Sequence, residues 1–244
     1  MARAAVSGRL IWRVATVLAV RTETPTATTL MLDIPDWPGH LPGQHVDVRL
    51  TAPDGYQAER SYSMGSAWVE GAPVELTVQR IDDGEVSSYL TEGVSAGDKL
   101  ELRGPIGGWF VWRSTSPAPV LLVAGGSGLV PLMAMVRARK LTRGRQPFRL
   151  IYSVRTHADA LYADELARRV RDDGGLDVHV VYTRETPRTR ISVATLNTHG
   201  WPPDFAPDCF VCGPTTFVEA VADMLVALGH EPRKIKTERF GGTS

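Results

Sequence analysis

Two glycine-containing turns are the segments of this sequence best suited to bind a phosphate. The turn Gly125-Gly-Ser-Gly128 follows the apolar run Val120–Val123 and precedes a helix-forming stretch, and Cys212-Gly-Pro214 ends a second apolar run. Glycine lets a backbone approach a pyrophosphate closely, and a helix N-terminus offers unpaired N–H groups. The first turn alone fits a purely structural role equally well. Together, at strand ends of one parallel sheet, they point at a common crevice and favour a dinucleotide site.

A third motif is Arg60-Ser-Tyr-Ser63, near the end of an expected strand. The guanidinium of Arg60 offers a planar fork for a phosphate, while Tyr62 offers an aromatic face and a hydroxyl, and Ser63 a small hydrogen-bonding group. Taken by itself, the tetrad is more typical of an ordinary edge strand than of a binding site.

The elements that must position these residues differ between the two halves of the chain. From about Arg9 to Trp112, short β-type runs alternate with turn residues, and one short helix fits, Val86–Glu92. This spacing predicts an antiparallel barrel or sandwich. The clearest runs are Thr28–Leu32, His45–Leu50 and Val74–Val78.

After Ser114–Pro117, which reads as a linker, strands alternate with helices. This alternation predicts a parallel sheet with helices on both faces, so the whole chain is expected to join a β-barrel to a Rossmann-like domain. The expected strands are Val120–Val123, Phe148–Tyr152, Asp177–Tyr182, Cys209–Cys212 and Ile235–Glu238, and the expected helices are Pro131–Leu141, Leu161–Arg171 and Thr215–Leu228.

Composition excludes several classes of partner. The 244 residues hold 27 basic and 27 acidic side chains, so a neutral chain gives no electrostatic case for nucleic acid or an anionic membrane. The uncharged stretch Ala118–Val136 is broken by its glycine turn and by Pro131, so no membrane segment is expected. No metal site is expected either, because the six histidines lack ligand spacing; we interpret them as surface or loop groups (His40, His45, His157, His179, His199 and His230).

The only two cysteines, Cys209 and Cys212, are too few to ligate an iron–sulfur cluster. Their C-x-x-C spacing leaves a redox dithiol open, but such motifs usually sit at a helix N-terminus. The apolar run that holds them favours a buried strand, and so a reducing, cytoplasmic compartment.

The motifs, in their order along the chain, resemble the ferredoxin–NADP reductase family. The resemblance spans essentially the whole chain, and five short motifs in the right order make it specific. It implies an antiparallel β-barrel FAD-binding domain over residues 9–113, followed by an α/β Rossmann-like NAD(P)-binding domain with a parallel sheet over residues 118–244. The motifs are Arg60-Ser-Tyr-Ser63, Gly84-Glu-Val-Ser87, Gly125-Gly-Ser-Gly128 with Pro131, Cys212-Gly-Pro214 and Glu238-Arg-Phe-Gly241.

The resemblance also implies a role for each motif. Arg60 would pair with the FAD pyrophosphate, alongside backbone N–H groups at the start of the short helix. Tyr62 and Ser63 would lie at the flavin ring, next to Ser61, and Cys212 near the position of hydride transfer. Glu238 and Phe240 would lie near the flavin and the nicotinamide. The remaining cofactor-binding residues would be Gly84, Val86 and Ser87 for FAD, and Gly125, Gly126, Ser127, Gly128, Pro131, Gly213 and Pro214 for the nicotinamide dinucleotide.

The choice between NADPH and NADH depends on charge beside the adenosine ribose, since a 2′-phosphate needs cations. Arg155 follows one expected strand, and Arg184 and Arg190 follow the next. The family resemblance gives such arginines a 2′-phosphate role in NADPH-using relatives, although solvated loop charges and NADH-using relatives with an arginine here are alternatives. The cluster favours NADPH.

These features predict an NAD(P)H reductase that passes electrons through FAD to a separate one-electron acceptor such as a ferredoxin, an oxygenase component or a haem protein. The chain holds no C-x₄-C-x₂-C run for an iron–sulfur domain of its own. Two alternatives stay open: a reductase of free flavin or another small acceptor, and a non-catalytic nucleotide-binding docking subunit. FMN could replace FAD, and a monomer or small oligomer is expected.

Overall fold

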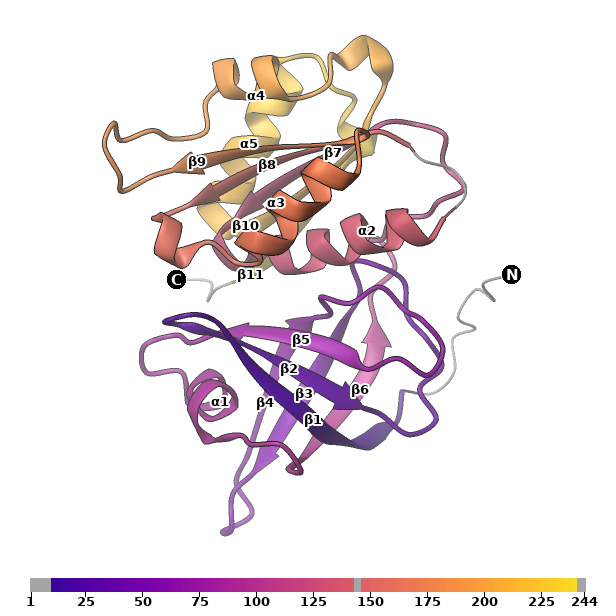
Figure 1. Cartoon of the computed structure of the whole chain (residues 1–244), viewed down its shortest axis with the longest axis vertical. Helices are drawn as coiled ribbons and strands as arrows, with labels where there is room; N and C mark the ends of the chain where they lie inside the picture. The colour runs from indigo at the N-terminus through magenta and orange to yellow at the C-terminus, as the bar shows by residue number, and fades with distance from the viewer. Residues whose placement is uncertain (1–9, 143–145, 241–244) are drawn as a thin grey trace. The chain divides into compact units, whose positions relative to one another are not determined.

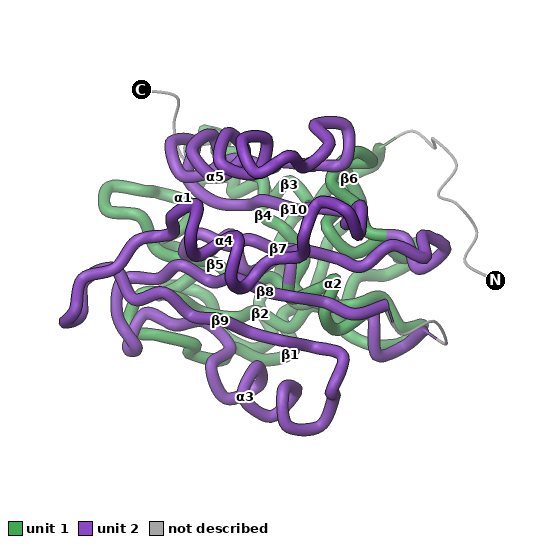
Figure 2. Tube along the Cα trace, turned by 90° about the horizontal axis from the view of Figure 1, so that it is seen from above, with its two compact units in different colours: residues 1–112, 133–138 green, residues 113–132, 139–244 purple. Residues whose placement is uncertain are grey.

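The computed structural model describes residues 10–142 and 146–240 and divides into two compact units. The first unit comprises residues 1–112 and 133–138, and the second comprises residues 113–132 and 139–244 (Figure 2). No helix within the described residues is long and apolar enough to cross a membrane; the uncharged stretch Ala118–Val136 is a strand, a turn and part of a helix.

The first unit is a six-stranded antiparallel sheet in the order β4-β3-β6-β1-β2-β5 (Figure 1). A bridge between Met64, just after β4, and Leu76 in β5 joins the two edge strands, so the sheet curls into a barrel. The strands are β1 (Trp12–Thr24), β2 (Ala27–Asp33), β3 (His45–Thr51), β4 (Gln57–Ser63), β5 (Val74–Gln79) and β6 (Lys99–Ile106).

Alternating side chains of these strands fill the barrel. Val46 and Val48 of β3 are fully buried, as are Leu30 and Leu32 of β2, whereas the residues between them in β3 are partly accessible. This period of two is the pattern expected of strands with one wet face. The predicted short helix exists as α1 (Glu85–Ser88), which continues as a π-helical turn, Tyr89–Gly93.

The second unit has a five-stranded parallel sheet in the order β11-β10-β7-β8-β9. Helices α4 and α5 cover one face and α3 the other (Figure 1). Its strands are β7 (Val120–Gly125), β8 (Phe148–Val154), β9 (Leu176–Tyr182), β10 (Asp208–Pro214) and β11 (Ile235–Phe240), and its helices are α3 (Ala163–Asp172), α4 (Val193–His199) and α5 (Thr215–Ala227). Helix α2 (Leu129–Leu141) starts and ends in this unit, while its residues 133–138 belong to the first.

These two architectures confirm the predicted fold class. Every strand and helix predicted for the second half is present, with ends that differ by a few residues. Helix α4 was not predicted, because only Leu196 of its seven residues is buried and its apolar periodicity is correspondingly weak. A capping box formed by Ser192 and Thr195 starts this helix.

Candidate functional site

In the first unit, β4 places Arg60 where its guanidinium is accessible. The pairing of β4 with β3 sets Arg60 opposite Val48 and Tyr62 opposite Val46. Arg60 donates a 2.7 Å hydrogen bond to the carbonyl oxygen of Glu59, and within residues 10–142 and 146–240 no carboxylate pairs with it. This exposed cation therefore remains able to bind an external anion.

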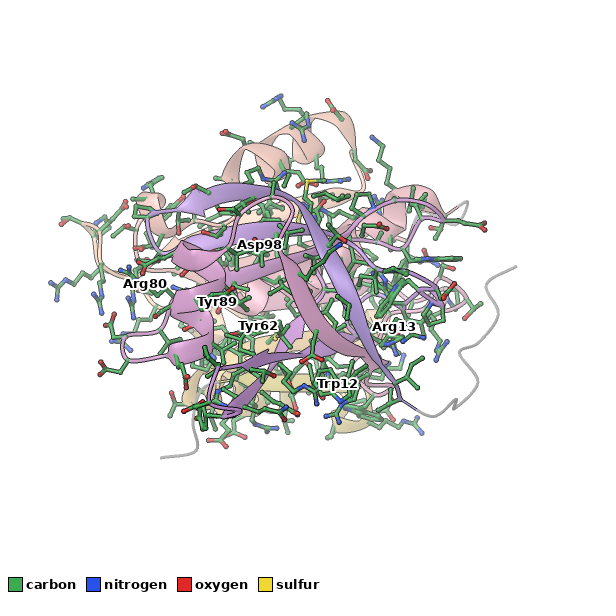
Figure 3. All side chains as sticks on the ribbon, turned by 90° about the horizontal axis from the view of Figure 1, so that it is seen from below. Trp12, Arg13, Tyr62, Arg80, Tyr89 and Asp98 are labelled. Carbon is green, nitrogen blue, oxygen red and sulfur yellow. The ribbon has the colours of Figure 1, made fainter. Side chains whose placement is uncertain are left out.

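The two side chains that follow Arg60 behave differently. Ser61 donates a 2.6 Å hydrogen bond to Asp47, whose other oxygen accepts a 2.7 Å bond from Arg103, so the hydroxyl of Ser61 is already used inside the protein. Tyr62 packs against the barrel core (Figure 3). Burial raises the pKa of Tyr62 to about 12 against the opposing effect of Arg60, so its phenol is neutral at physiological pH. Ser63 is half-buried opposite His45.

Helix α1 contacts β4, and its N-cap residue is Gly84, so no side chain caps the start of the helix. The first N–H groups of a helix lack intrahelical acceptors, so those of this turn are left for another acceptor. A Cβ on Gly84 would lie 2.4 Å from Oγ of Ser87, which explains the glycine. Ser87 donates to the carbonyl oxygen of Gly84 and accepts from the N–H of Ile81, while Val86 is buried. Any ligand here would meet backbone N–H groups rather than these side chains.

In the second unit, the two glycine turns lie against each other. The strands that end in them, β7 and β10, are paired neighbours, with Ala124 opposite Cys212. A Cβ on Gly128 would lie 2.1 Å from the carbonyl oxygen of Cys212, and one on Gly213 would lie 3.1 Å from Cα of Gly125. The prediction that both turns reach the same edge of the sheet is confirmed, and glycine is required for their contact.

Two helices start at these turns without a side-chain cap. Helix α2 begins after the short 3₁₀ turn Gly126–Gly128, with Pro131 buried in its first turn, and α5 begins after Pro214. Neither has an acidic residue in its first turn. Two positive helix ends at one edge of the sheet suit an anion such as a pyrophosphate.

Sequence reasoning missed Phe217, in the first turn of α5. Its ring would be 2.7 Å from a Cβ on Gly125 and 2.8 Å from one on Gly213, so it occupies the space that both glycines leave. An aromatic residue three positions after Pro214 was the available signal. Gly126, with a φ of +55°, has open space where its side chain would be, and Ser127 is half-buried beside it.

Cys212 and Glu238 lie opposite each other on the paired strands β10 and β11. Burial raises the pKa of Cys212 well above its usual value, and the charge of Glu238 acts in the same direction, so the thiol is neutral. Burial also raises the pKa of Glu238 to about 7. Phe240 lies opposite Pro214 at the end of the same pairing. Gly241, the last residue of that motif, lies outside the described residues.

The arginines predicted to select the nucleotide stand at the carboxyl ends of β8 and β9. The N–H of Arg184 donates a 2.9 Å hydrogen bond to the carbonyl oxygen of Arg155, so these two residues are adjacent, and both are exposed. Arg190 is exposed in the same loop, and within the described residues no hydrogen bond or ion pair joins its side chain to theirs. Glu185 is engaged elsewhere: its carboxylate accepts 2.6 Å bonds from the N–H and from Nδ1 of His157, and these bonds lower the pKa of Glu185.

The interpretation of the histidines as surface or loop groups was wrong for His45 and His179, which belong to strands β3 and β9. His40 and His230 lie in loops, as predicted, but they are buried. His40 accepts from the indole of Trp37 and bonds the carbonyl of Ser66, and its burial lowers its pKa, so this neutral imidazole is a structural link. The buried-strand interpretation of the cysteines is confirmed: Cys209 and Cys212 are free thiols inside β10, and burial raises the pKa of Cys209 to about 12.

Known families match both units of this chain. Residues 15–111 match the oxidoreductase FAD-binding domain family, and residues 122–223 match the oxidoreductase NAD-binding domain family. The chain belongs to the ferredoxin–NADP reductase family. It is accordingly a flavoprotein oxidoreductase with an FAD-binding and an NAD-binding domain. Both glycine turns described above lie within the matched NAD-binding segment.

Individual relatives agree with this family assignment. The reductase subunit of glycine betaine monooxygenase from Chromohalobacter salexigens is 31% identical over 211 residues, which are 83% of this chain and 56% of the relative. The chain thus spans about half the length of that curated relative. The FAD/NAD-binding domain of a nitric oxide dioxygenase from Vibrio cholerae superposes with a TM-score of 0.83 at 26% identity, covering 94% of this chain and 99% of that one. A cytochrome P450 reductase from Amycolatopsis gives a TM-score of 0.85 at 25% identity, covering 98% of this chain and 72% of that one.

Proposed function

We propose that this oxidoreductase takes a hydride from NADPH and passes the electrons, through FAD, to a separate one-electron acceptor protein. The observation that supports it best is that each of the two units has uncapped helix N-termini able to bind an anion. The first unit has an exposed guanidinium on the strand next to an uncapped helix start, and the second has two uncapped helix starts at glycine turns that contact each other.

The residues of the first unit fit FAD. Its pyrophosphate would meet Arg60 and the backbone N–H groups of Val86 and Ser87, and an anion there would satisfy donors that the protein leaves open. The neutral phenol of Tyr62 and the half-buried Ser63 would contact the ring. Bound FAD would supply the redox chemistry, because a flavin accepts a hydride and returns electrons singly.

The residues of the second unit fit a nicotinamide dinucleotide. The turns Gly125–Gly128 and Cys212–Pro214 would hold it, with the helix ends facing its pyrophosphate. Cys212 would offer the nicotinamide a neutral, weakly polar contact, since its pKa lies well above the physiological range. Glu238, with a pKa of about 7, would hold a proton beside this contact in part of the population. Phe240 would lie at the same end of the sheet.

A preference for NADPH rests on the charges at the ends of β8 and β9. Arg155, Arg184 and Arg190 are exposed, and within the described chain none of them pairs with a carboxylate. The nearby acid, Glu185, is bound by His157 instead. A 2′-phosphate would therefore meet cations and no competing free carboxylate.

The names of two relatives support the proposal of a separate acceptor. The similar Chromohalobacter protein is named as a reductase subunit of a monooxygenase, and the similar Amycolatopsis protein as a cytochrome P450 reductase. By analogy, we propose an oxygenase component or a haem protein as the acceptor of this chain, in keeping with the cytoplasmic setting that its two free cysteines suggest.

The test is an anaerobic stopped-flow titration of the FAD-loaded protein with NADPH and then NADH, following the visible flavin band. Rapid bleaching is expected with both, and faster with NADPH at low concentration. A protein that binds no FAD, or whose flavin neither nucleotide bleaches, would show that it is not a reductase. Faster bleaching by NADH would refute only the nucleotide preference.

A further inference from the structure

A pocket in the first unit is unrelated to the motifs described above. It measures about 350 Å³ and lies between the end of β2, the loop that follows it, and the segment that leads into β5. Leu32, Ile34 and Val74 line it with Pro73 and Ala72. This volume lies within the range that accommodates an organic group.

Two tryptophans of the pocket are held in place by the surrounding protein. The indole N–H of Trp37 donates a 3.1 Å hydrogen bond to Nδ1 of the buried His40. Trp68 lies over Gly39, where a Cβ would be 2.8 Å from its ring, and the φ of +86° at that glycine favours the same residue type. The aromatic walls are therefore positioned before any ligand arrives, which lowers the entropic cost of binding.

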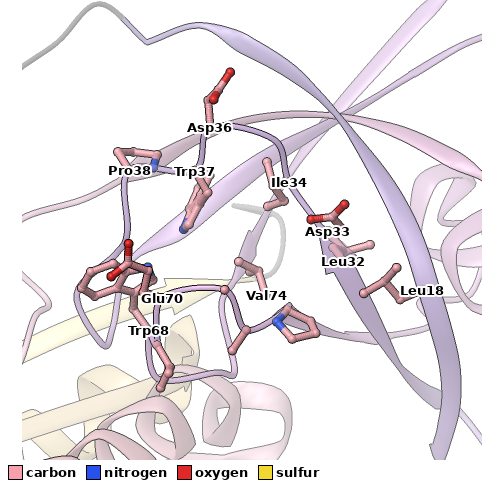
Figure 4. A pocket seen from close by; sticks show the side chains of 14 residues that line it. Leu18, Leu32, Asp33, Ile34, Asp36, Trp37, Pro38, Trp68, Glu70 and Val74 are labelled. Atoms are coloured by element: carbon pink, nitrogen blue, oxygen red, sulfur yellow. The ribbon is translucent and has the colours of Figure 1, made fainter.

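The charge of the pocket has one sign. Asp33, Asp36 and Glu70 line it, and no lysine, arginine or histidine does. Within residues 10–142 and 146–240, no hydrogen bond or ion pair engages these three carboxylates. Figure 4 shows Glu70 beside Trp68 at one end of the pocket and Asp33 beside Leu18 at the other. Arg13, from outside the lining, already places its guanidinium carbon 5.9 Å from the ring centre of Trp37.

Exposed apolar side chains surround this acidic and aromatic pocket. Leu18, Trp68 and Val69 all line it, and they are 49%, 40% and 46% exposed. Large apolar side chains gathered in one exposed place are typical of a surface that another protein covers. Acids and tryptophans together favour a cation, since a guanidinium or ammonium group gains both from carboxylates and from aromatic faces.

We propose that this pocket docks a protein partner by receiving a lysine or arginine side chain whose apolar neighbours cover Leu18, Trp68 and Val69. The proposal rests on the proposed function in one respect: a reductase that gives electrons to a separate protein must be bound by that protein. A basic segment flanked by apolar residues would complement both the acids of the pocket and the exposed apolar side chains around it. A small free cation would leave Leu18, Trp68 and Val69 uncovered.

The experiment uses the full chain labelled with ¹⁵N, and follows the indole signals of Trp37 and Trp68, assigned through Trp37→Phe and Trp68→Phe. The probe is a blocked pentapeptide, Leu-Arg-Val-Lys-Leu; the same peptide with Gln in place of Arg and Lys tests the charge, and N-acetyl-lysine methylamide tests a free cation. The double variant Asp33→Asn/Glu70→Gln removes the pocket's end charges. Asp204→Asn/Glu219→Gln, two exposed acids of the second unit, is the matched control.

The basic peptide is expected to shift both indole signals, and to bind the pocket variant about tenfold more weakly than either the native chain or the control variant. Equal binding of the Gln peptide, or equal binding to the pocket variant, would overturn the proposal. Lysine methylamide binding as tightly as the peptide would indicate a small-molecule site and overturn the docking assignment. Reduction of ferricyanide by NADPH, measured on the same samples, should be equal in all variants; its absence from the native chain would count against the reductase function and leave the peptide result standing.

Discussion

The start of α1 in the first unit and the paired starts of α2 and α5 in the second are all uncapped helix N-termini beside glycine, yet their surroundings differ. Helix α1 has four residues and depends on an exposed guanidinium from β4 for positive charge. Helices α2 and α5 have 13 residues each, and the turns before them are packed backbone to backbone. Under the proposed function, different groups would carry binding and folding in the first unit, whereas the same backbone atoms would carry both in the second.

The sharpest test of this difference is Gly128→Ala. Its Cβ would lie 2.1 Å from the carbonyl oxygen of Cys212, and neither backbone can move without disturbing β7 or β10. We expect a loss of about 3 kcal/mol in the free energy of unfolding and, with it, loss of nicotinamide binding. Urea unfolding and an NADPH titration measure the two effects.

The matched control for that variant is Gly126→Ala. Gly126 has open space around its missing side chain, so the substitution costs only the left-handed backbone, about 1 kcal/mol. Equal destabilisation by the two variants would show that contact between the turns does not set the requirement for glycine.

Glu238, the buried acid opposite Cys212, provides a second test in the second unit. Burial raises the pKa of Glu238 from 4.5 to about 7, so the folded protein retains a proton that the unfolded chain releases. Stability is therefore lost as pH rises from about 4.5 to about 7 and is constant above that, with a total loss of up to about 3 kcal/mol. Glu238→Gln should remove this part of the pH dependence of the unfolding free energy.

The control for Glu238 is Glu219→Gln on α5, an exposed acid whose loss should leave the pH dependence as it is. Urea unfolding of the nucleotide-free protein at about pH 4.5 and about pH 8 gives the comparison. An unchanged difference between the two pH values in Glu238→Gln would mean that this carboxyl is not desolvated in solution.

The features that could be predicted from the sequence are those that depend on local patterns. Both units were predictable because the alternation of Val46 and Val48 with accessible residues, and the apolar runs before Gly125 and Cys212, depend on local periodicity. The adjacency of the two glycine turns was also predictable, because parallel strands end at the same edge of a sheet.

Contacts between side chains that are far apart in the sequence could not be predicted from it. The burial of His40 depends on Ser66, 26 residues away, and the engagement of Glu185 depends on His157, 28 residues away. The packing of Phe217 against Gly125 and Gly213 likewise requires three segments to be placed first. Neither a motif nor a period in the sequence records such contacts.

In the first unit, we expect that FAD binding can be lost while folding is kept. Arg60→Ala should weaken retention of FAD tenfold or more, roughly the contribution of one charge-assisted hydrogen bond, with an unchanged unfolding midpoint in the FAD-free protein. Arg168→Ala, an exposed arginine of α3, is the control and should retain FAD fully. Dialysis followed by flavin absorbance measures occupancy, and full occupancy in Arg60→Ala would remove Arg60 from the site.

The smallest expected effects concern the loop after β9, where we propose that side-chain charge of the second unit binds the nucleotide. Arg184→Ala should raise the KM for NADPH about tenfold and leave the KM for NADH unchanged, because only NADPH presents a 2′-phosphate to the guanidinium. Glu185→Gln should change either KM by less than about threefold, since His157 already binds its carboxylate. Steady-state rates with both nucleotides, with ferricyanide as the acceptor, measure the two variants side by side. If Glu185→Gln instead raised the KM for NADH alone, Glu185 would be releasing His157 to bind the ribose hydroxyls, and the loop would select NADH.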